Sequence, residues 1–107
     1  MSTGITTGNV LAMGVFQATI DLASVSAATS AEQTFTVPGL RVGDFVFVNI
    51  PSTLNNGLGI AGARVSAADT LALRIMNATA GALDAASAAF TVLVVRPETV
   101  GATAFSP

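Results

Sequence analysis

Five residue types that carry much of protein chemistry are missing from this 107-residue sequence, namely Cys, His, Lys, Trp and Tyr. Without Cys the chain forms no disulfide bond and offers no thiolate ligand. Without His and Lys it lacks the commonest general base and the amine nucleophile. This inventory predicts a protein that is not an enzyme, with no catalytic residues, no metal site and no cofactor.

Charge is also scarce. Charged residues make up 9% of the sequence, against about 25% in an average soluble domain. The four basic residues are arginines scattered along the chain, and the formal net charge is −2. They form no basic patch for phosphate groups, so we expect neither nucleic acid nor an anionic membrane as a partner. Because Lys is the usual solubilising residue, its absence predicts that much of the surface faces protein.

The six carboxylates are isolated from one another in the sequence. A pair assembled by the fold would suit a glycosidase, so a carbohydrate-binding module or small glycosidase is kept as an alternative. Sugar sites use exposed Trp and Tyr platforms, which this chain lacks. We therefore expect no small-molecule substrate, and turn, cap and ion-pair roles for the carboxylates.

Long apolar segments are missing too. No stretch reaches 18 apolar residues without Pro, Asn, Ser or a charge, so no transmembrane helix is expected. The first 14 residues have neither a basic region nor a long apolar region, so they do not resemble a signal peptide. The expected place of synthesis is a cytosol-like compartment.

What the sequence does have is alternation of apolar and other residues, bounded by Gly, Pro and Asn. It predicts six strands, over residues 15–25, 32–37, 44–50, 57–66, 70–77 and 89–96. The Ala-rich segment 77–90 has no apolar stripe and is predicted to be a loop. This pattern predicts an all-β fold, a small antiparallel β-sandwich that is jelly-roll-like. We expect the sandwich over 15–97, an N-terminal arm over 1–14 and a C-terminal tail over 98–107.

Two sets of residues receive specific roles. Segment 44–50 is apolar on both faces, which predicts burial on both sides. Four phenylalanines sit at strand positions and are expected in the core, namely Phe35, Phe45, Phe47 and Phe90. Among the charged residues, Asp44 and Asp69 are expected to bind turn amides. A structural ion pair is expected among Arg64, Arg74 and Asp69.

Several turns and strands together form a recognisable pattern between residues 35 and 97. Val42-Gly43-Asp44 leads into a strand, and Gly57-Leu58 and the run ARVSAADTL from Ala63 to Leu71 follow. One strand then ends at Asn77 and the last ends at Arg96-Pro97. This pattern resembles that of small virion proteins of tailed bacteriophages, described as head decoration or cement proteins.

The resemblance implies a compact β-sandwich that forms trimers on the outside of an icosahedral shell and bridges coat subunits. The expected partners are the major capsid protein and further copies of this chain. The expected location is the capsid surface of a virion made in a bacterial host cytoplasm. We expect partner contacts at Ile5, Val10 and Leu11 in the arm and at Phe105 in the tail. A head-fibre or tail-associated phage domain is the alternative.

Overall fold

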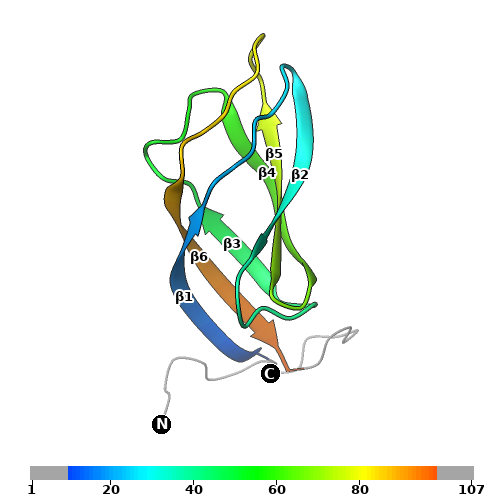
Figure 1. The fold of residues 1–107 in the computed structure, drawn as a ribbon. Coiled ribbons are helices and arrows are strands. Elements are labelled where there is room, and N and C mark those ends of the chain that lie inside the picture. The colour runs from blue at the N-terminus through cyan, green and yellow to red at the C-terminus, as the bar shows by residue number, and fades with distance from the viewer. Residues whose placement is uncertain (1–9, 99–107) are drawn as a thin grey trace.

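The structure, a computed structural model, describes residues 10–98 and contains six β-strands (Figure 1). The strands are β1 (Val10–Ile20), β2 (Thr29–Thr36), β3 (Phe45–Asn49), β4 (Leu58–Ala67), β5 (Thr70–Asn77) and β6 (Ala88–Pro97). Within this part of the chain there is no helix, so the predicted all-β class is confirmed.

The six strands form two three-stranded antiparallel sheets, with the orders β1-β6-β3 and β2-β5-β4. Figure 1 shows them as two layers, one with β1, β6 and β3 and the other with β2, β5 and β4. Among these strands only β4 and β5 are neighbours in both sequence and sheet. Every other connection between consecutive strands therefore carries the chain from one sheet to the other.

The two sheets share one hydrophobic core. Because side chains alternate across a strand, Leu71, Leu73 and Ile75 of β5 turn inward, and each has an exposed fraction of 0%. From the other sheet Phe90 and Val92 of β6 meet them in the same cluster. Buried residues from the connections close its ends, namely Leu22, Val25, Val37, Leu40 and Ala85. The predicted core position of Phe90 is confirmed, and Phe35 packs against the cluster.

Two of the four predicted core phenylalanines are not in the core. Phe45 and Phe47 have exposed fractions of 59% and 58%, whereas Val46 between them is buried. The prediction that segment 44–50 is buried on both faces is therefore wrong. The physical reason is the number of layers: within residues 10–98 a second sheet covers only one face of β3.

Strand β1 begins at Val10, whereas the alternation predicts a strand from residue 15. Residues 10–14, which the sequence assigns to the arm, pair with the end of β6, from Val10 opposite Pro97 to Gly14 opposite Val94. A register shift lies between Val10 and Ala12. The backbone hydrogen bonds that β6 offers extend the strand here, in a stretch whose small residues obscure the alternation.

The connection after β5 is a loop, as predicted, and a buried side chain organises it. Asn77 is 2% exposed and its Nδ2 donates to the carbonyl oxygens of Val25 and Gly81, both at 2.9 Å. Its Oδ1 accepts hydrogen bonds from the backbone N–H and the hydroxyl of Thr79. All four bonds use the full capacity of one amide, so the loop is fixed against the β1–β2 connection.

Gly57 is expected to resist substitution because of its backbone conformation and its neighbour. Its φ is 91°, and an added Cβ would collide with Cγ2 of Thr79. We expect Gly57→Ala to lower the free energy of unfolding by about 2 kcal/mol, measured by urea denaturation. Gly59→Ala is the control, since a Cβ there has no other atom within 4 Å. Equal losses for the two variants would contradict this account.

Candidate interaction surface

The outward side of the β1-β6-β3 sheet is lined by apolar side chains in register. Opposed residues make one row of Met13, Val95 and Phe45, and the next row of Val15, Leu93 and Phe47. A polar row follows, made of Gln17, Thr91 and Asn49. We call the first two rows, together with Leu11 at the start of β1, the apolar face.

The apolar face is open to solvent within the described part of the chain. The exposed fraction is 68% for Val15, 59% for Leu11 and 52% for Met13, and Phe45 and Phe47 have the values given above. Leu93 and Val95 are half-buried, because β6 is the middle strand and its neighbours flank them. Single exposed apolar residues are ordinary, whereas a contiguous set on one sheet makes this face the candidate interaction surface.

The outward side of the other sheet is different. Arg64 on β4 reaches across β5 to Glu32 on β2, with Nε to Oε2 at 2.9 Å and Nη2 to Oε1 at 2.8 Å. Ala72 of β5 faces the same side and is 0% exposed. The hydrogen bonds from Arg64 lower the pKa of the Glu32 carboxyl. This sheet therefore has a solvated, charged outer surface, in contrast to the apolar face.

The predicted ion pair exists, but its members differ from those expected. Arg64 pairs with Glu32, and Asp69 instead accepts a hydrogen bond from the Gly39 amide at 2.8 Å. Gly39 lies in the turn at Pro38-Gly39, so the expected role of Asp69 as an acceptor for a turn amide is confirmed. The pairing of β2 with β5 brings Glu32 within reach of Arg64. The local sequence around either residue does not reveal this strand pairing.

A second ion pair fixes one end of the apolar face. Asp44 directly precedes β3, and its Oδ2 accepts from the Arg41 amide at 3.0 Å, which confirms the predicted turn role. It also binds Arg96 of β6, with Nε to Oδ1 at 2.8 Å and Nη2 to Oδ2 at 2.7 Å. The bonds from Arg96 and then from Arg41 hold the pKa of Asp44 below its ordinary value. Since its side chain is 2% exposed, Asp44 holds the start of β3 against β6.

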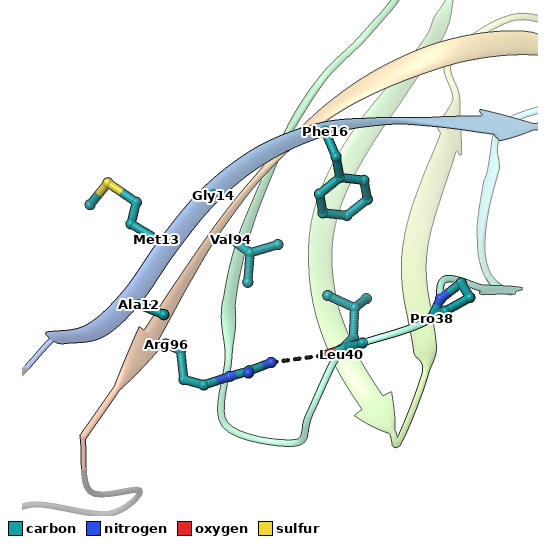
Figure 2. Close-up of a pocket in the computed structure, with 9 residues that line it drawn as sticks. Ala12, Met13, Gly14, Phe16, Pro38, Leu40, Val94 and Arg96 are labelled. Atoms are coloured by element: carbon teal, nitrogen blue, oxygen red, sulfur yellow. Dashed lines mark hydrogen bonds between the residues drawn. The ribbon is translucent and has the colours of Figure 1, made fainter. Parts of the chain in front are cut away.

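A hollow of about 250 Å³ lies beside this ion pair, between β1, β6 and the β2–β3 connection. Figure 2 shows Phe16, Leu40 and Val94 pointing into it, whereas Met13 points away from it. Arg96 crosses its mouth, and Nη2 donates to the Gly39 carbonyl at 2.8 Å. The small residues Ala12 and Gly14 on the inner side of β1 leave this space unfilled. Its lining is mainly apolar.

The predicted contact residues are placed in part. Leu11 is exposed and belongs to the apolar face, and Val10 beside it is half-buried. Ile5 and Phe105 lie outside the described residues. The sequence analysis did not identify the other residues of the face. For Phe45 and Phe47 the signal is the apolar pattern on both sides of segment 44–50, which the sequence analysis interprets as double burial.

Residues 10–98 contain no group of three or more His, Cys, Asp or Glu side chains placed to hold a metal ion. In the same range, no helix has the length and apolar character needed to cross a membrane. Comparison of the chain with protein-family models, with curated proteins and with solved structures finds no match.

Proposed function

We propose that this chain is a structural protein of a phage virion, a decoration or cement protein that binds the outside of the head shell and stabilises it. The observation that supports this most is the apolar face, with five side chains more than half exposed on one sheet. A surface of this kind is typical of a chain that works inside a permanent assembly, because such interfaces are apolar and poor in charge.

The resemblance of residues 35–97 to phage decoration proteins supplies the virion part of the proposal. In full, it is a jelly-roll-like sandwich with terminal arms, attached to the major capsid protein through the N-terminal arm and the lower face of the sandwich, which lies on the shell. Homo-oligomers of the chain then bridge coat subunits. Stabilisation of this kind needs many repeated contacts and no catalytic step, so the proposal assigns the chain no cofactor and no small-molecule substrate.

The proposal is tested by adding the purified protein to shells of its own phage that lack it. We expect saturable co-sedimentation at a fixed ratio to coat protein, and rupture of the loaded shells at a higher temperature. Shells of an unrelated phage are the control and should bind nothing. Absence of binding to its own shells would overturn the head role. Antibody label confined to the tail would replace it with the fibre or tail-associated role.

A further inference from the structure

We infer that the apolar face is the contact between two copies of this chain, which meet face to face across a two-fold axis. From the proposed function the inference takes only the premise that the chain works in an assembly. It concerns the isolated chain, so either proposal can fail without the other.

The exposed area of the face matches what such a contact needs. A Phe side chain has about 150–250 Å² of surface that can be buried. The face has five large apolar side chains that are each more than half exposed, so together they present roughly 500 Å². This is near the upper end of the apolar patches on monomers, ~300–600 Å². Two such faces together bury roughly 1,000 Å² before Leu93, Val95 and the rim are added, which reaches the lower limit of a specific interface.

The distribution of exposed apolar residues favours a two-fold contact. Of the large hydrophobic side chains that are exposed in residues 10–98, only Met76 lies on the other sheet. The rest belong to the face or, like Val42 and Ile50, flank β3. A ring about a three-fold axis joins two different patches on each copy, whereas a two-fold contact joins one patch to itself. One apolar patch within residues 10–98 therefore suits a pair, which departs from the trimer that the resemblance implies.

The face is also suited to contact with itself. Its two rows and Leu11 are uncharged, so turning the face onto a second copy brings no like charges together. Sheets pack on sheets about 10 Å apart through such alternating side chains. The polar row of Gln17, Thr91 and Asn49 borders the apolar rows and provides the hydrated rim that specific interfaces have.

Sedimentation equilibrium of the full chain, with Met13→Lys and Met76→Lys as matched variants, tests this inference. Met13 and Met76 are both strand residues and are 52% and 48% exposed, but only Met13 is on the face. For the unmodified chain, of 10.6 kDa, we expect the mass of two copies at micromolar concentration. We expect Met13→Lys to weaken the association at least tenfold, because it buries an unpaired ammonium in the contact, and Met76→Lys to leave it unchanged.

A second face variant, Val15→Lys, should weaken the association as Met13→Lys does, which shows that the effect belongs to the face and not to Met13 alone. Far-UV circular dichroism checks that each variant is folded. A monomer at tens of micromolar, a trimer, or equal effects of Met13→Lys and Met76→Lys would each overturn the inference. Monomeric protein that binds shells and thereby protects Met13 from oxidation would assign the face to the coat protein. Pairs that form normally but bind no shells would leave the inference standing and overturn the proposed function.

Discussion

Replacement of Phe90 with alanine is expected to lower the free energy of unfolding by about 4 kcal/mol. Phe90 is 1% exposed and is the largest fully buried side chain of the core, so its truncation loses the transfer free energy of a phenyl group and leaves a cavity. The loss is measured by urea denaturation at several protein concentrations. We expect it to be the same at each concentration, because the core lies within a single copy. Phe90→Leu, expected to cost about 1–1.5 kcal/mol, gives a measurable value if the alanine variant does not fold.

Phe47→Ala is the matched control for Phe90→Ala. Phe47 is 58% exposed, so its truncation is expected to change the stability of the single chain by less than about 1 kcal/mol. If the apolar face joins two copies, a further loss appears only at concentrations where pairs form. An equal loss at Phe47 and Phe90, independent of concentration, would mean that both rings belong to one core and would contradict the burial described above.

These two phenylalanines mark the limit of what the sequence predicts. The alternation located all six strands, and the bounds of β5 agree with the prediction at both ends. It did not decide which apolar side of β3 is covered, because Phe45 and Val46 are equivalent in a period-two pattern. That choice depends on how many layers pack together, which is a tertiary property.

The polar contacts show the same limit. The acceptor roles of Asp44 and Asp69 were predictable, because short polar side chains beside turns bind backbone amides. The distant partners were not predictable, since Gly39 is 30 residues from Asp69, Arg96 is 52 from Asp44 and Arg64 is 32 from Glu32. The two ion pairs depend on the strand orders β1-β6-β3 and β2-β5-β4.

The pair of Asp44 and Arg96 is expected to produce the second large effect. Asp44→Asn should lower the free energy of unfolding at pH 7 by about 3 kcal/mol, because it leaves the guanidinium of Arg96 without its counter-charge at a largely buried position. Glu32→Gln is the matched control. Its partner Arg64 is 65% exposed, and exposed pairs contribute ~0–1 kcal/mol. Similar losses for the two variants would show that burial does not distinguish the two pairs.

The same carboxylate predicts how stability depends on pH. The bonds from Arg96 and Arg41 lower the pKa of Asp44 in the folded chain below its ordinary value of 3.8, so the unfolded chain binds a proton more readily. The stability that the pair contributes is therefore complete above about pH 5 and is lost as the pH falls through 3.8 toward the folded-state pKa. Thermal unfolding between pH 6 and about pH 2.5 should show a decline in Tm that is clearly shallower in Asp44→Asn, because the variant lacks the titrating group. An equally steep decline in the variant would mean that the acid sensitivity arises from other carboxylates and that Arg96 does not lower the pKa of Asp44.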